Sequence, residues 1–177
     1  MQAAIPQFAE EGFAKASIDR IIEDLDLTKG AVYHHFRDKS QLFEAAFVTV
    51  EDRFLGRLET GLVGVDDPRE RLATCIDLFL AACREPEYLR IAVLEAPAAL
   101  GWERWKELED HRLVGVVAAQ LAALHGEQSG DTGSATMVVG AASEAGFELS
   151  AVSAPRVASE RQRLGGLVMR MVDGLSP

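Results

Sequence analysis

A short stretch near the start of the chain gathers side chains that suit nucleic-acid binding. Residues 28–39 hold three basic groups and one acidic group, a local charge of +2, although the whole chain carries −10. Lysine can donate to guanine in a major groove and a small apolar side chain can touch a thymine methyl group, whereas hydroxyl and ammonium groups suit phosphates. The candidates for base contacts are Lys29, Ala31 and His34, with Gly30 allowing close backbone approach, and those for phosphate contacts are Ser17, Thr28, Tyr33 and Lys39.

Two short helices and a tight turn would position these side chains. Ser17 is a good N-cap, and residues 18–25 after it place isoleucine and leucine on one helical face. Residues 26–27 break this helix, and Thr28 can then cap a second one. Two helices joined by a short turn form a helix-turn-helix, whose second helix fits a DNA major groove.

The chain resembles the tetracycline-repressor-like (TetR) family of transcriptional regulators at these residues and at a few flanking ones. The matching segments are 8–13, 17–18, 27–36 and 39–42, which together cover about the first quarter of the chain. The resemblance implies a homodimer that binds a pseudo-palindromic double-stranded DNA operator, most often as a repressor. It also implies a small, often hydrophobic effector bound in the C-terminal part.

Several departures from the family's pattern support an alternative. Ile22 and Leu25 stand where the family usually has small residues, and Asp26 stands where it has glycine. Residues 1–47 hold five basic and eight acidic side chains, so the positive patch is narrow. The chain also begins partway through the family's first helix: either the true start lies upstream of Met1, or the chain is short there. The alternative is a helical small-molecule-binding dimer of the same fold with weak or lost DNA binding.

The rest of the pattern is helical, and no strand-like alternation occurs. Residues 38–41 form a capping-box signature, and a stripe of phenylalanine, valine and leucine predicts one long helix over 39–62. This helix is longer than the small N-terminal bundle, so it must extend beyond that bundle and link the two halves of the chain. We predict an all-α fold in which an N-terminal three-helix helix-turn-helix domain, residues 1–47, is joined by the long helix to a helical ligand-binding and dimerisation domain, residues 48–177.

Apolar residues of the second half are candidates for an effector pocket. Periodicity and prolines predict helices over 68–83, 87–95 and 102–125. The pocket interpretation depends mainly on the resemblance, and an ordinary apolar core explains the same residues equally well. The pocket candidates are Phe79, Cys83, Tyr88, Ile91, Trp102, Trp105, Met137 and Phe147.

The last two predicted helices are candidates for a dimer interface. Residues 135–152 are rich in glycine and alanine, which allow close helix approach, and residues 164–175 carry an amphipathic stripe. One interpretation is a core hairpin inside one subunit. The other, which the resemblance favours, is a hairpin that pairs with its twin in a four-helix bundle. The interface candidates are Ala141, Ala145, Leu149, Leu164, Val168 and Met171.

The sequence argues against several other classes of protein. No apolar run approaches the roughly 18 residues that a membrane span needs, and no signal peptide is visible, so we expect a cytoplasmic protein. Cys75 and Cys83 are the only cysteines and are expected to be buried thiols. No nucleophile motif, metal-ligand spacing or phosphate loop is found, so we expect no enzyme activity, metal or cofactor.

Overall fold

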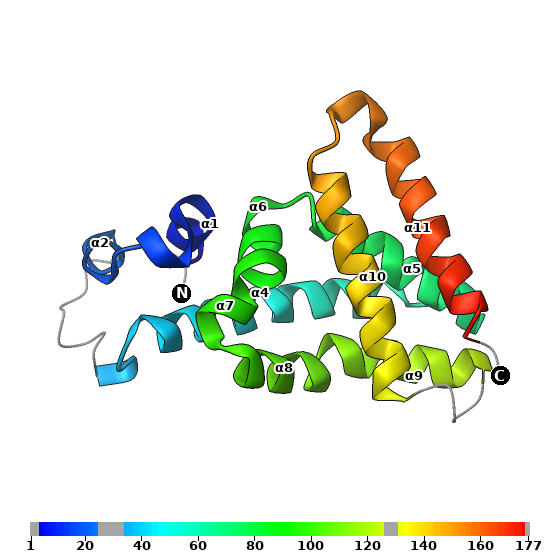
Figure 1. Ribbon diagram of the computed structural model, residues 1–177, viewed down its shortest axis with the longest axis horizontal. Helices are drawn as coiled ribbons and strands as arrows, with labels where there is room; N and C mark the ends of the chain where they lie inside the picture. Colours follow the sequence, from blue (N-terminus) through cyan, green and yellow to red (C-terminus); the bar gives the residue numbers. More distant parts are fainter. Residues whose placement is uncertain (1–3, 25–33, 126–130, 176–177) are drawn as a thin grey trace.

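The computed structural model describes residues 4–24, 34–125 and 131–175, which are built of helices with no strand among them (Figure 1). This confirms the predicted all-α fold. The elements, in chain order, are α1 (Ala4–Lys15), α2 (Ile18–Asp24), α4 (Lys39–Gly61), α5 (Pro68–Ala82), α6 (Pro86–Tyr88), the π-helix η1 (Leu89–Glu95), α7 (Ala96–Leu100), α8 (Trp102–His111), α9 (Leu113–His125), α10 (Thr132–Ser150), the 3-10 turn η3 (Ala154–Arg156) and α11 (Val157–Asp173).

The longest described helix, α4, runs from the N-terminal helices into the rest of the molecule (Figure 1). The Asp38 carboxylate caps it by accepting from the Gln41 N–H at 2.9 Å, and the Gln41 side chain accepts from the Arg37 N–H at 3.0 Å. The predicted cap and the predicted long helix are therefore confirmed. The predicted apolar stripe is buried along α4 through Phe43, Phe47, Val50, Phe54 and Leu58.

The N-terminal helices are fastened to α4 by aromatic contacts. Gly12 leaves helical geometry at φ +78° and ψ 165°, as a glycine stop predicts, and one more turn follows to Lys15. Phe8 and Phe13 of α1 meet the Phe43 ring edge-on, with centroids 5.0 Å and 5.2 Å away. Such pairs stabilise beyond the area they bury, so α1 and the start of α4 pack as one unit.

The single helix predicted over 102–125 is wrong, because the chain forms α8 and α9 with a break at Arg112. This residue has φ −116° and ψ −96°, and its guanidinium binds the Asp52 carboxylate of α4. No residue of α8 is fully buried, whereas Leu113 and Val114 enter the core at the start of α9. Because of this break, α9 presents to the core a face that a straight continuation of α8 would not present.

The short helix predicted over 87–95 also differs from the structure. The three-residue α6 leads into the π-helix η1, and η1 continues directly into α7. Gly101 then ends this run with a φ of +80°, a conformation that glycine adopts without strain.

The hairpin of α10 and α11 packs on α5 and α9 and lies at the opposite end of the molecule from α1 and α2 (Figure 1). Arg84, just after α5, donates to the carbonyls of Leu149, Ser150 and Val152 at 2.7–3.0 Å. A cation at a helix C-terminus is favourable, so this side chain fixes the end of α10 against α5. Within the described ranges, no helix has the length and apolar character needed to cross a membrane.

Candidate functional site

Most of the predicted DNA contacts fall outside the described residues. In the segment 25–33, which the structure does not describe, are Thr28, Lys29, Gly30, Ala31 and Tyr33. The contacts predicted for these five stay predictions. His34 is described and exposed, next to the exposed His35. Ser17 is exposed immediately before α2, and its carbonyl accepts from the Ile21 N–H at 3.1 Å, as expected for a residue at the N-cap.

The predicted phosphate contact Lys39 makes contacts within the chain. Its ammonium donates to the carbonyls of Ala14 at 3.1 Å and Ala16 at 3.2 Å, and it lies 4.8 Å from the centre of the Phe13 ring. Ala14 lies in the last turn of α1, and Ala16 lies between α1 and α2. Because an ammonium has three donors, a phosphate contact by Lys39 must use the remaining donor or replace one of these partners. In this structure Lys39, at the start of α4, holds the end of α1 and the residue that follows it.

Two carboxylates interact at the edge of the core, the buried Glu51 on α4 and the partly buried Glu109 on α8. Glu51 is only 2% exposed and accepts a hydrogen bond from the Tyr88 hydroxyl. Burial raises the pKa of Glu51 to about 7, against the opposing effects of the Tyr88 hydrogen bond and the Arg112 charge. Burial, followed by the charge of Glu51, raises the pKa of Glu109 to about 7.

Sequence reasoning missed both carboxylates. A signal existed for Glu51, which lies four residues after Phe47 and three before Phe54, on the buried side of α4. No comparable pattern marks Glu109, because α8 has no continuous buried face. Among the described residues, no three histidine, cysteine, aspartate or glutamate side chains are grouped so that they could hold a metal ion.

The predicted effector residues divide into a buried group and an exposed group. Buried together in the core are Phe79, Cys83, Tyr88 and Ile91. Exposed are Trp102, Met137 and Phe147, at 65%, 68% and 51%, while Trp105 is partly buried with its ring 5.0 Å from that of Trp102. The exposed three therefore do not line an internal pocket of this subunit.

The buried group surrounds little empty space. The rings of Phe79 and Tyr88 lie 5.9 Å apart, and both pack against Phe54, at 5.9 Å and 4.9 Å. Beside Phe79 is an apolar cavity of about 20 Å³, lined by Cys75, Ile76, Phe79, Leu113, Val117, Val138, Val139 and Ala142. This volume has room for about one water molecule, so an effector requires these side chains to move apart.

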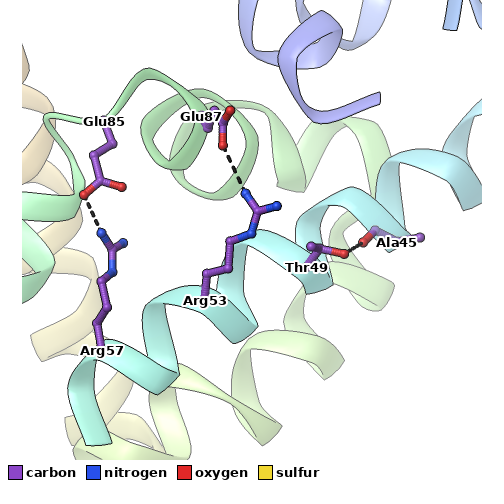
Figure 2. Close-up of polar contacts among 6 residues, drawn as sticks. All are labelled: Ala45, Thr49, Arg53, Arg57, Glu85 and Glu87. Atoms are coloured by element: carbon purple, nitrogen blue, oxygen red, sulfur yellow. Dashed lines mark hydrogen bonds and ion pairs between the residues drawn. The ribbon is translucent and has the colours of Figure 1, made fainter. Parts of the chain in front are cut away.

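A more open cleft lies between α4 and the segment that leads into α6 (Figure 2). Arg53 reaches Glu87 at 3.3 Å and Arg57 binds Glu85, so two ion pairs cross it. The cleft measures about 380 Å³, and its lining includes Tyr88, whose hydroxyl contacts the buried Glu51. Nearby, the Thr49 hydroxyl donates to the Ala45 carbonyl at 2.7 Å and so faces its own helix (Figure 2).

The last two helices have an exposed apolar side and a buried one. Exposed are Met137 and Phe147 on α10 and Leu167 and Met171 on α11. Of the predicted interface residues, only Met171 (52% exposed) belongs to this side, and Ala141 is partly exposed. The others lie in the subunit's own core, where Ala145, Leu149, Leu164 and Val168 are at most 7% exposed. In this structure those four support the exposed face from beneath.

Comparison with known proteins matches both parts of the chain. A model of the tetR family of bacterial regulatory proteins matches residues 1–46, and a model of tetracycline repressor-like C-terminal domains matches residues 69–175. The fold is similar to that of a TetR-family transcriptional regulator from Pectobacterium atrosepticum, with a TM-score of 0.74 at 24% identity over 99% of this chain and 91% of that one.

Two curated relatives align with part of the chain. It is 32% identical over 91 residues to an HTH-type transcriptional repressor of Mycobacterium tuberculosis, covering 47% of this chain and 49% of the relative. It is 42% identical over 98 residues to the probable acrEF/envCD operon repressor of Escherichia coli K12, covering 51% of this chain and 44% of the relative. The chain thus spans about half the length of each. Because the C-terminal family model alone matches more than half of the chain, the chain belongs to the tetracycline-repressor-like (TetR) family of bacterial regulatory proteins.

Proposed function

We propose that the chain is a DNA-binding transcriptional repressor that acts in the cytoplasm as a homodimer. Residues 1–47 read a pseudo-palindromic operator, and residues 48–177 bind a small apolar effector and form the dimer. The observation that carries this proposal is the match of family models to both parts, at 1–46 and 69–175. The two curated relatives described above are named as repressors, which favours repression over activation.

The exposed apolar side of α10 and α11 supports the dimer. Four large apolar side chains, Met137, Phe147, Leu167 and Met171, are 40–68% exposed there. Large apolar side chains exposed on two adjacent helices are typical of an interaction site. Two copies paired through this face would hold two reading heads for successive major grooves, about 34 Å apart along the operator.

A charge placed in this face is expected to separate the dimer. Phe147→Glu and Met171→Glu each bury a carboxylate without a partner if the two copies still associate, which is strongly unfavourable. The mass in solution should fall from twice 19.2 kDa to the mass of one chain, as measured by sedimentation velocity. The matched control is Val63→Glu, because Val63 is 80% exposed after α4 and is not part of the hairpin, and this variant should remain dimeric. If Phe147→Glu and Met171→Glu stay dimeric as well, this face is not the interface.

His34 and its neighbour provide a sharp test of DNA reading. His34→Ala should change operator preference and weaken binding to the best site by about 5- to 100-fold, in the range for loss of one base contact. His35→Ala is the control, since adjacent helical residues point in different directions and both rings are exposed. The operator is first selected from random DNA with the unchanged protein, and fluorescence anisotropy then measures each variant. Equal effects of the two substitutions would contradict the assignment of His34 to the groove.

The same selection separates the proposal from its alternative, a dimer that keeps the fold but no longer engages DNA. At about 50 mM salt, phosphate contacts are strong and even a weak reader should bind selectively. A repressor enriches a pseudo-palindromic sequence, and adding its effector lowers the binding. A dimer without DNA binding enriches nothing at any salt concentration, while its apolar core still takes up small apolar compounds.

A further inference from the structure

The turn that leads from α1 into α2 is held from two sides. Because Gly12 breaks α1, the Phe13 N–H cannot make the regular helical bond to the residue four before it. It donates to the Glu95 carboxylate at the end of η1. On the other side, Lys39 donates to the carbonyls of Ala14 and Ala16. The position of α2, which follows directly, therefore depends on one residue from η1 and one from α4.

The site around Glu95 is built for close approach. A Cβ atom at Gly12 would lie only 2.5 Å from Glu95 Oε1, so glycine is needed there both for its φ of +78° and for space. Arg90 holds the same Oε1 at 3.1 Å and reaches the Glu10 carbonyl at 3.5 Å. Residues five apart point in different directions on an α-helix, and the wider turn of the π-helix brings Arg90 and Glu95 together.

The π-helix also belongs to the interior of the C-terminal part. Ile91 is fully buried and Ala92 is 6% exposed, and η1 contacts α1, α4, α7 and α10. Glu95, at the end of this helix, therefore links the core to the α1 turn through its carboxylate, in addition to the packing of α1 on α4, α6 and η1. Arg20 of α2 pairs with Glu11 of α1 at 2.6 Å, which couples α2 to the same turn.

We propose that Glu95 is a positioning residue for DNA binding, because its carboxylate fixes the α1 turn and thereby the orientation of the helix-turn-helix relative to the core. This inference rests on the proposed function. It assigns Glu95 no contact with DNA. Its effect on affinity acts through the hydrogen bond to the Phe13 N–H and through the brace from Arg90.

The first measurement needs no DNA. In full-length protein, deuterium exchange of the Phe13 amide is followed by NMR in the unchanged chain and in Glu95→Ala and Glu95→Gln. Loss of a hydrogen bond to a charged group should speed this exchange by about 10-fold or more in Glu95→Ala. Glu95→Gln should lie between the two, because an amide oxygen still accepts from Phe13 but no longer pairs with Arg90. The control is Asp77→Ala, which removes an ion pair of 2.9 Å to Arg161 between α5 and α11.

The second measurement is affinity for the DNA flanking the protein's own gene, by fluorescence anisotropy at low salt. Glu95→Ala should bind about 10-fold more weakly, Glu95→Gln should recover part of the loss, and Asp77→Ala should match the unchanged protein. The melting temperature of Glu95→Ala should be only slightly below that of Asp77→Ala, since the first variant loses two partly exposed polar contacts and the second loses one. A purely structural role of Glu95 would lower the melting temperature and the affinity together, with no partial rescue by glutamine.

The outcomes separate this inference from the function on which it rests. Unchanged exchange at Phe13 in Glu95→Ala overturns the inference, and so does unchanged DNA affinity in a protein that binds DNA. If the unchanged chain binds no DNA, the proposed function fails, and the exchange measurement still decides whether Glu95 holds the α1 turn.

Discussion

Glu51→Gln is expected to raise the free energy of unfolding by about 3 kcal/mol at pH 8 and to leave it nearly unchanged at pH 4. Glu51 is 2% exposed, and burial raises its pKa from 4.5 to about 7. Between pH 4.5 and pH 7 the Glu51 carboxyl therefore keeps its proton in the folded state, whereas it has lost that proton in the unfolded state. The stability linked to this proton is fully present below pH 4.5 and disappears as the pH rises through 7. Glutamine keeps the neutral form at every pH and can still accept from Tyr88.

Denaturant unfolding at pH 4, 6 and 8 measures the effect, with the m-value checked for constancy. Glu59→Gln is the matched control, since Glu59 is exposed on the same helix and its replacement should change stability by less than about 0.5 kcal/mol. If Glu51→Gln loses stability with rising pH as steeply as the unchanged chain, burial of Glu51 does not set this dependence. Because the charge of Glu51 raises the pKa of Glu109, the variant should also lower the pKa of Glu109.

The parts of the fold that could be predicted from the sequence are those that local sequence signals determine. The Asp38 cap fixes the start of α4, and Asp67 with Pro68 does the same for α5, where the Asp67 carboxylate accepts from the Glu70 N–H at 2.8 Å. Such caps act within one turn of helix and need no information from the rest of the chain. The long stripe of α4 likewise repeats enough times to define one face.

The errors occur where a distant contact decides the structure. The break between α8 and α9 follows from Arg112, whose partner Asp52 lies sixty residues earlier in the chain. The π-helix η1 ends in Glu95, which binds the backbone of Phe13 eighty-two residues away. Nothing in the periodicity around either residue indicates these partners.

The candidate site shows a related limit. The sequence predicts pocket positions for Met137 and Phe147 and an interface position for Leu149, whereas in the structure the first two are exposed and the third is fully buried. Small or apolar residues occur around much of α10, so periodicity indicates that it packs on several sides but not which partner covers each side. Only the packing of α10 on α5, α9 and α11 distinguishes the inner face from the outer one.

Gly146→Ala is expected to destabilise the protein by about 2 kcal/mol, the reverse of the usual effect in a helix. A Cβ atom at Gly146 would lie 2.4 Å from the Cys83 Sγ and 2.9 Å from the Cys83 Cβ. The second atom is fixed to the backbone, so the end of α5 and the last third of α10 must move apart. Cys83→Ala removes the nearer atom, and the double variant should recover part of the lost stability.

The control is Gly56→Ala on α4, where an added Cβ meets nothing within 4 Å, and it should gain up to about 1 kcal/mol. Thermal and denaturant unfolding of the four variants and the unchanged chain give these differences, and a stabilised Gly146→Ala would show that α5 and α10 are not in close contact at this point.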